Sequence, residues 1–149
     1  MYNHILITSD GSDFSNKGVQ HGLQLARVLN CKVTVLTVTE PFFLHAGVGG
    51  SGWIATEEDI SRFTAMQNEF ADDILKQAST AAAKLGVTIS PLRVENQFPA
   101  EAITDEAARL GCDLIVMASH GRRGLSRLLL GSQTAEVLTR SKIPVLVVR

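Results

Sequence analysis

A glycine-rich segment in the second half of the chain combines residue types that bind anions. It reads ASHGRRGLSRLLLGSQTAEV from Ala118 to Val137 and follows the apolar run DLIVM. Gly121 lets a ligand approach the backbone closely, and Ser132 and Thr134 place hydroxyl groups where a helical pattern resumes. The first turn of a helix offers N–H groups that have no intrahelical partner. The segment therefore predicts an anion site, with a glycine turn followed by an ordinary serine cap as the alternative.

A second candidate is the acidic residue of SDGSD, residues 9–13. Asp10 comes just after the apolar run HILIT. A carboxylate at the end of a central strand can accept hydrogen bonds from ribose hydroxyls or help to hold a metal ion. An aspartate before glycine is equally typical of a turn in which the carboxylate bonds its own backbone. Both interpretations stay open from the residues alone.

The segment GVGGSG at 47–52 matches the G-x-G-x-x-G fingerprint of dinucleotide-binding folds, but its context is wrong. That fingerprint should directly follow a strand and open a helix. Here residues 39–46 intervene after the preceding apolar run, and the next helical pattern begins only near Thr56. We interpret the segment as a surface loop, anchored by Trp53, that could cover a ligand without contacting phosphate.

Several catalytic motifs are absent, namely the P-loop, the H-E-x-x-H metal site and the G-x-S-x-G nucleophile. His120 stands alone in its loop, which is more typical of an exposed or hydrogen-bonded histidine than of a general base. The acidic residues between 57 and 73 are typical of a solvated helix face. We therefore assign no catalytic residue.

Apolar runs rich in Val, Ile and Leu predict five strands, at residues 4–8, 32–38, 87–94, 113–118 and 143–148. Because helical patterns lie between them, we expect a Rossmann-like α/β fold, a parallel sheet with helices on both faces. Proline cannot donate to a strand ladder, so Pro91 and Pro144 place the third and fifth strands outermost, in the order 3-2-1-4-5. Ligands bind such sheets where the strand order reverses. Asp10 and the glycine-rich segment should therefore meet at one crevice.

Four helices are expected, from 12 or 13 to 29, from 56 to 85, from 99 to 110 and from 132 to 140. Thr56 and Asp59 match a capping box at the start of the second helix, which carries apolar residues at helical spacing along its whole length. Gly18, Gly22 and Ala26 form a stripe of small residues suited to close packing against a sheet.

The composition indicates a single globular domain, residues 1–149, because the chain is 45% hydrophobic with a formal net charge of −1. The near-neutral charge argues against nucleic-acid binding, which needs a basic face. Cys31 and Cys112 lie far apart in the sequence, so we expect no disulfide and a reducing, cytoplasmic location. Neither a signal peptide nor a membrane span is evident.

The glycine-rich segment also matches a family pattern. Ala118, Gly121, Gly131 and Ser132 follow the fourth expected strand in the spacing A-x2-G-x9-G-S. This resembles the G-x2-G-x9-G-[ST] motif of the ATP-binding branch of the universal stress proteins. ILITSDGS resembles the end of that family's first strand, VLTV its second strand, and SKIPVLVV the last strand, through which its members dimerise. From end to end the chain is similar to a universal stress protein domain, with its adenine nucleotide alpha hydrolase-like fold.

The resemblance implies an adenine nucleotide, ATP or AMP, with Mg²⁺ at Asp10 as a candidate metal, and a homodimer through Ile143–Val148. Thr8 and Val38 would flank the adenine, and Asp10 would lie near the ribose. Arg122, Arg123 and Arg127 would either face phosphate or a neighbouring subunit, or form an exposed basic surface. The expected nucleotide-binding residues are Thr8, Ser9, Asp10, Val38, Met117, Ala118, His120, Gly121, Arg122, Arg123, Gly131, Ser132, Gln133 and Thr134.

Ala118 departs from the family motif, which has glycine at that position. If the position needs only a small side chain, binding survives. If it needs a left-handed backbone, the methyl group strains the site. We expect binding to survive, because Ala118 ends a strand, where φ is negative.

The expected function is a dimeric, nucleotide-responsive binding module of the stress response that acts on an unidentified protein partner. One alternative is a slow ATPase or phosphotransferase, for which the sequence offers no evident base or Walker lysine. The other is a nucleotide-free scaffold of the same fold, in which the glycine-rich loop is only structural.

Overall fold

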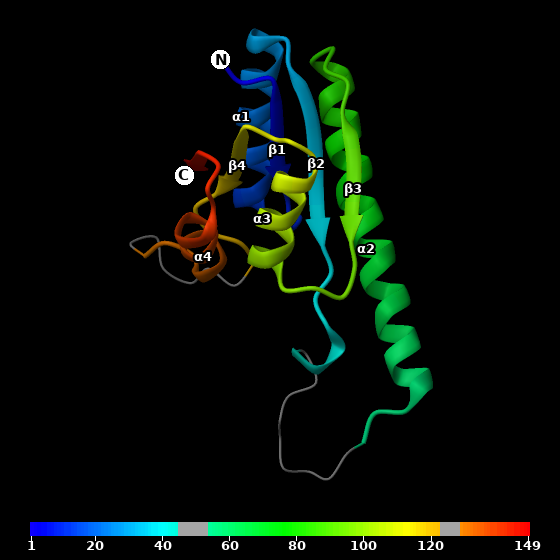
Figure 1. Cartoon of the computed structure of the whole chain (residues 1–149). Helices are drawn as coiled ribbons and strands as arrows, with labels where there is room; N and C mark the ends of the chain where they lie inside the picture. Colours follow the sequence, from blue (N-terminus) through cyan, green and yellow to red (C-terminus); the bar gives the residue numbers. More distant parts are fainter. Residues whose placement is uncertain (45–53, 123–128) are drawn as a thin grey trace.

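The computed structural model describes residues 1–44, 54–122 and 129–149 (Figure 1). The segment 47–52, Trp53, Arg123 and Arg127 lie outside the described residues. Helices and strands alternate along the chain in the order β1 (His4–Thr8), α1 (Asp13–Leu29), β2 (Lys32–Val38), the 3-10 helix η1 (Phe42–Leu44), α2 (Glu57–Lys84), β3 (Ser90–Val94), α3 (Pro99–Arg109), β4 (Leu114–Ala118), α4 (Ser132–Arg140) and β5 (Val145–Val148).

The sheet is parallel, with the strand order β3-β2-β1-β4-β5, as the prolines predicted. Both outer strands begin later than expected. The N–H of Val87 bonds the carbonyl of Ala82, so Val87 belongs to the turn that ends α2. The N–H of Ile143 donates to Ser141 Oγ, which places Ile143 in the turn before β5. Short outer strands result, and the central strand β1 pairs with β2 on one side and β4 on the other.

Two helical layers cover the sheet, and side chains of each strand alternate between them. In Figure 1, α3 and α4 lie in front of the sheet and α1 lies behind it. The core on the α1 and α2 side includes Ile5, Ile7, Leu23, Val35, Leu75 and Val116. The core on the α3 and α4 side includes Leu6, Leu36, Ile103, Ile115, Met117 and Val137. No helix within the described ranges has both the length and the apolar character needed to cross a bilayer.

The helix ends follow the expected capping chemistry. Ser12 is the N-cap of α1, and its side chain accepts the N–H of Ser15. Thr56 and Asp59 form the capping box of α2, in which Thr56 Oγ1 accepts the Asp59 N–H at 3.1 Å and Asp59 Oδ2 accepts the Thr56 N–H at 2.9 Å. Gly111 follows α3 with a φ of 66°, a conformation that glycine adopts without strain.

The first half of α2 is less buried than its apolar spacing suggests. The buried residues of this helix begin at Ala71, whereas Ile60 and Phe70 are 42% and 43% exposed. Figure 1 shows why, because α2 extends beyond the ends of the strands and only its second half lies against the sheet. Phe63 instead contacts the ring of Phe42 in η1, with ring centroids 5.2 Å apart.

The small-residue stripe of α1 packs against the central strands, as expected. A Cβ added to Gly22 would lie 2.7 Å from Cδ1 of Ile7 and 3.3 Å from Cγ1 of Val116. A Cβ added to Gly18 would lie 3.3 Å from the backbone nitrogen of Ala118. These glycines let α1 approach β1 and β4 closely, so the helix fills the space on that side of the sheet.

Replacing Gly22 by alanine should lower the free energy of unfolding by about 1–3 kcal/mol, because the added methyl group overpacks the core. The higher helix propensity of alanine, worth about 1 kcal/mol, offsets part of this loss. Urea unfolding at neutral pH measures the change. Gln24→Ala, at an exposed position of the same helix, serves as the control and should shift stability by less than about 0.5 kcal/mol. An unchanged midpoint for Gly22→Ala would show that Ile7 moves aside freely.

Candidate functional site

A cavity of about 360 Å³ lies at the carboxyl ends of the central strands. All of the expected nucleotide-binding residues line it except Arg123, which lies outside the described residues. They come from the ends of β1, β2 and β4 and from the start of α4. The structure therefore brings together the two sequence segments that the topology assigned to one crevice. Whether these residues contact a nucleotide stays a prediction.

One side of the cavity is apolar. Leu36 and Val38 line it from β2, Met117 from β4, and Pro99 and Ile103 from the first turns of α3. Leu36 and Val38 share a face of their strand because side chains repeat every two residues, and Pro99 and Ile103 share a face of their helix because they are four apart. This wall can receive a flat, apolar-faced group such as a base.

Sequence reasoning missed some residues of the lining, namely Ser15, Leu36, Glu40, Pro99 and Ile103. Strand alternation from Val38 could have identified Leu36. Pro99 was recognised only as the start of a helix. Its place in the cavity depends on how α3 packs over the sheet, which periodicity does not indicate.

The turn after β1 is held by hydroxyl groups. Ser9 Oγ lies 3.1 Å from Ser15 Oγ, and Thr37 Oγ1 donates to the Ser9 carbonyl at 2.6 Å. All three residues are buried. The N–H of Gly11, which has a φ of 80°, also donates to Ser9 Oγ. This network fixes the backbone on either side of Asp10.

Asp10 links that turn to the glycine-rich loop. Its Oδ1 accepts the N–H of Ser12 at 3.0 Å, the self-bonded turn that the sequence left open. Its Oδ2 accepts the backbone N–H of Arg122 at 2.7 Å. A Cβ on Gly121 would lie 2.5 Å from the same oxygen. Glycine at 121 is therefore required for the carboxylate to reach the loop.

The surroundings of Asp10 favour its ionised form. Burial alone would raise the pKa of this carboxyl, but hydrogen bonds from Ser12 and from the Arg122 backbone outweigh it and hold the pKa below its usual value. The described residues contain no group of three or more His, Cys, Asp or Glu side chains able to hold a metal ion. A Mg²⁺ ion at Asp10 would therefore depend on oxygens of a ligand or of water, and stays a prediction.

The start of α4 closes the opposite side of the cavity. The Gly131 N–H donates to the Ser119 carbonyl at 2.8 Å, and Thr134 Oγ1 donates to the Ala118 carbonyl at 2.9 Å. The N-cap of α4 is Gly131, and Ser132 is the first helical residue. The ordinary serine cap is therefore not formed, and the helix start that lines the cavity has no capping side chain.

His120 braces the loop and is buried. Its Nε2 bonds the carbonyl of Leu129, so this nitrogen carries the proton. Nδ1 then accepts from Ser119 Oγ at 2.9 Å, and the ring lies 5.5 Å from that of Phe14. Both ring nitrogens are engaged in holding the two ends of the loop, in agreement with a hydrogen-bonded histidine.

Comparison with known proteins identifies the family. The model of the universal stress protein family matches residues 1–149. The chain belongs to this family. The universal stress protein MJ0531 of Methanocaldococcus jannaschii is 32% identical over 152 residues, which cover 100% of this chain and 83% of the relative.

Solved structures of universal stress proteins share the fold. MJ0577 of Methanocaldococcus jannaschii superposes with a TM-score of 0.82 at 27% identity, over 99% of this chain and 96% of that one. A universal stress protein in complex with cAMP superposes with a TM-score of 0.73, also at 27% identity, over 99% of this chain and 97% of that one. The Rossmann-like α/β architecture with strand order 3-2-1-4-5 is thus the universal stress protein fold.

In this universal stress protein, alanine at position 118 does not strain the backbone. Among the described residues that are not glycine, positive φ occurs only at Asn30 and Asn96. Ala118 is the last residue of β4 and, by strand alternation, faces the same side as Val116, toward α1. The close approach of Gly18 lies on that side. The methyl group of Ala118 therefore does not point into the cavity from the α3 side. The backbone of Ala118 is also not left-handed, because its φ is not positive.

Arg122 is exposed, and its guanidinium lies over the ring of Phe70 in α2, 5.2 Å from the ring centroid. The backbone of this residue contacts Asp10, so Arg122 joins the glycine-rich loop to α2 as well as to β1. This contact was not among the alternatives that the sequence offered for the arginines.

Asp10→Asn should destabilise the protein at neutral pH, and the difference from the unmodified protein should shrink as the pH falls below about 4. The folded state lowers the pKa of Asp10, so its carboxylate stabilises the fold above the unfolded pKa, and this contribution is lost as the pH falls through the folded value. Urea unfolding from pH 7 to pH 3 measures the trend. Asp105→Asn, at an exposed position of α3, is the control. A difference that is constant over this range would contradict the role of the charge.

Proposed function

We propose that the cavity binds an adenine nucleotide, ATP or AMP, and that the protein is a nucleotide-responsive module of the stress response. The observation that carries this proposal is that an apolar wall and the start of α4 border the same cavity. A base fits against the apolar wall, and phosphate suits the free N–H groups and partial positive charge of a helix start. The volume of about 360 Å³ also lies in the range of small-molecule sites.

The positions of individual residues support this orientation. Val38 and Met117 lie on the apolar side, where the base would sit. Gly131 and Ser132 lie at the helix start, where phosphate would sit. Asp10 uses two of its acceptor positions on backbone N–H groups, and a carboxylate has about four, so it can still accept a ribose hydroxyl. The relative in complex with cAMP binds a ligand of the same chemical class.

We infer a binding module rather than an ATPase. A general base needs a free nitrogen or oxygen within reach of the attacking water. Both nitrogens of His120 are already engaged in hydrogen bonds, and the lowered pKa of Asp10 makes its carboxylate a weak base. The nucleotide would therefore act by stabilising one arrangement of the cavity walls, which a protein partner could recognise.

We also propose a homodimer through the last strand. β5 pairs with β4 on one side and is one of the two edge strands of the sheet. Its residues Val145–Val148 are only half-buried. An apolar edge strand with unpaired N–H and C=O groups is suited to pairing with another strand, and a second copy about a two-fold axis supplies one.

Nucleotide binding is tested by Ser132→Asp. The new carboxylate stands at a helix start, where the helix dipole tolerates it, but it repels phosphate. AMP and ATP affinity should fall by about 100-fold, or about 2.7 kcal/mol, while the melting temperature without ligand stays the same or rises. Ser132→Asn, similar in size but uncharged, is the matched control and should lose much less.

Calorimetric titration of nucleotide-stripped protein with ATP, ADP and AMP, with and without Mg²⁺, gives the affinities. Dissociation constants above about 1 mM for all three would favour the nucleotide-free scaffold. Sensitive phosphate-release measurements on the same samples test the slow ATPase, and sustained turnover would overturn the inference of a binding module.

Val147→Lys should convert the dimer to a monomer. Leu146 and Val148 pack against the core on the α1 side and Val145 against the core on the α3 side, so Val147 is the β5 residue whose replacement least disturbs the fold. Light scattering at micromolar concentration measures the mass. Met66→Lys, at an exposed apolar position of α2, is the control and should remain dimeric. A single-chain mass for the unmodified protein would refute the proposed dimer.

A further inference from the structure

The first turn of α3 lacks a cap of its own. Its N-cap residue is Phe98, which makes no side-chain capping bond, and Pro99 follows in the first turn. The next residue, Ala100, is almost fully buried, so its N–H has no access to water. A buried N–H without an acceptor is strongly unfavourable. The acceptor must therefore come from another element.

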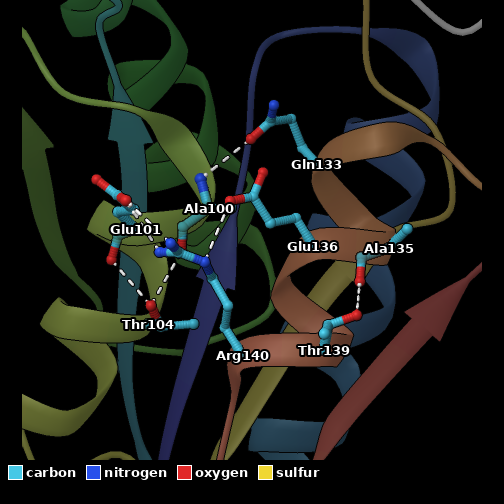
Figure 2. A network of polar contacts seen from close by, with 8 residues as sticks. All are labelled: Ala100, Glu101, Thr104, Gln133, Ala135, Glu136, Thr139 and Arg140. Carbon is cyan, nitrogen blue, oxygen red and sulfur yellow. Dashed lines mark hydrogen bonds and ion pairs between the residues drawn. The ribbon is translucent and has the colours of Figure 1, made fainter.

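Gln133 of α4 supplies this acceptor. Its side-chain carbonyl oxygen Oε1 accepts the Ala100 N–H at 3.1 Å. Figure 2 shows the side chain reaching from α4 across to the start of α3, with its amide nitrogen turned away from Ala100. A side chain of α4 thus supplies the capping acceptor that Phe98, the N-cap residue of α3, does not provide.

A second connection joins the same helices farther from the cavity. Arg140 contacts Glu101 of α3 at 3.0 Å and Glu136 of its own helix at 3.1 Å (Figure 2). Gln133 and Arg140 are seven residues apart and therefore lie on the same face of α4. Only Gln133 lines the cavity; the residues of the Arg140 cluster do not.

We call the hydrogen bond from the Ala100 N–H to Gln133 the cross-cap. It affects the cavity because Ala100 adjoins residues of the apolar wall. Ala100 follows Pro99, and Ile103 lies one turn farther along α3, and both of these neighbours line the cavity. If the first turn of α3 loosens, this wall moves. Val38 and Met117, beside which the base would sit, line the same cavity.

We propose that Gln133 is a positioning residue for base recognition: by capping α3 from α4, it fixes the wall formed by Pro99 and Ile103. This inference rests on the proposed nucleotide site and adds to it a function for the Gln133 side chain that does not require contact with phosphate. An acceptor oxygen at this position is the essential feature, and the amide NH₂ is not.

Two substitutions distinguish the contribution of the Gln133 acceptor oxygen from that of its amide NH₂ group. Gln133→Leu keeps a similar length but removes the oxygen, so the Ala100 N–H loses its partner. Gln133→Glu keeps an acceptor at the same reach, and a carboxylate is favourable at a helix start. Arg140→Gln is the matched control, because it breaks the other connection between α3 and α4 without touching the cavity lining.

Calorimetric titration with adenosine measures binding at the base site alone, because adenosine carries no phosphate. The carboxylate introduced by Gln133→Glu therefore has no phosphate to repel. Gln133→Leu should weaken adenosine binding about tenfold and speed hydrogen exchange at the start of α3. Gln133→Glu should keep both properties within about twofold of the unmodified protein. Arg140→Gln should lower the melting temperature but leave adenosine affinity within about twofold.

Other outcomes overturn the proposal in distinguishable ways. Equal adenosine affinity for Gln133→Leu and the unmodified protein would show that the cross-cap does not position the wall. An equal loss in Gln133→Leu and Gln133→Glu would show that the amide itself contacts the ligand. If the unmodified protein binds neither adenosine nor AMP, the proposed nucleotide site fails, and the function of Gln133 in base recognition fails with it.

Discussion

The hydrogen bond from the Arg122 backbone to the Asp10 carboxylate joins parts of the chain that are 112 residues apart in sequence. It requires β1 and β4 to be neighbours, because only then does the turn after one strand meet the loop after the other. It also requires glycine at 121, where a Cβ would collide with the carboxylate. Both partners of this contact line the cavity. The contact places Gly121 and Arg122, which follow β4, beside the turn that follows β1.

The helices on the two faces of the sheet take different parts around the cavity. On the α1 side, Gly18 and Gly22 bring the helix into close contact with β1 and β4. On the other side, the first turns of α3 and α4 contribute Pro99, Ser132 and Gln133 to the lining of the cavity. Ala118 has its methyl group on the close-packed side. A departure from the family motif is therefore compatible with an open site.

Much of the fold could be predicted because it depends on local chemistry. Capping at Ser12, Thr56 and Gly111 depends on residues within a few positions of each helix end, and the outer strands were evident from Pro91 and Pro144. The exposure of Ile60 and Phe70 could not be predicted, because periodicity identifies a helix face without saying what lies against it.

Long-range contacts explain the rest of what the sequence did not reveal about the site. Asp10 was recognised as a candidate, but its bond to the Arg122 backbone was not, since a backbone N–H leaves no signal in the residue types. The bond between Gln133 and Ala100 was missed for the same reason. In both pairs a side-chain oxygen accepts a hydrogen bond from the backbone N–H of a distant segment. Only the packed structure shows which segment that is.

The strand order also has a consequence for the chain as it is synthesised. β1 leaves the ribosome before the other strands of this sheet, yet it lies in the middle of the sheet, with Ile5 paired to Leu114. At about 5–20 residues per second, the partner strand emerges several seconds after β1. Until then one edge of the central strand is open, and the residues of β4 and α4 that line the cavity are missing. A nascent chain that stops short of α4 lacks the helix start that lines the cavity, so a ligand of the proposed site would stabilise only chains that already include α4.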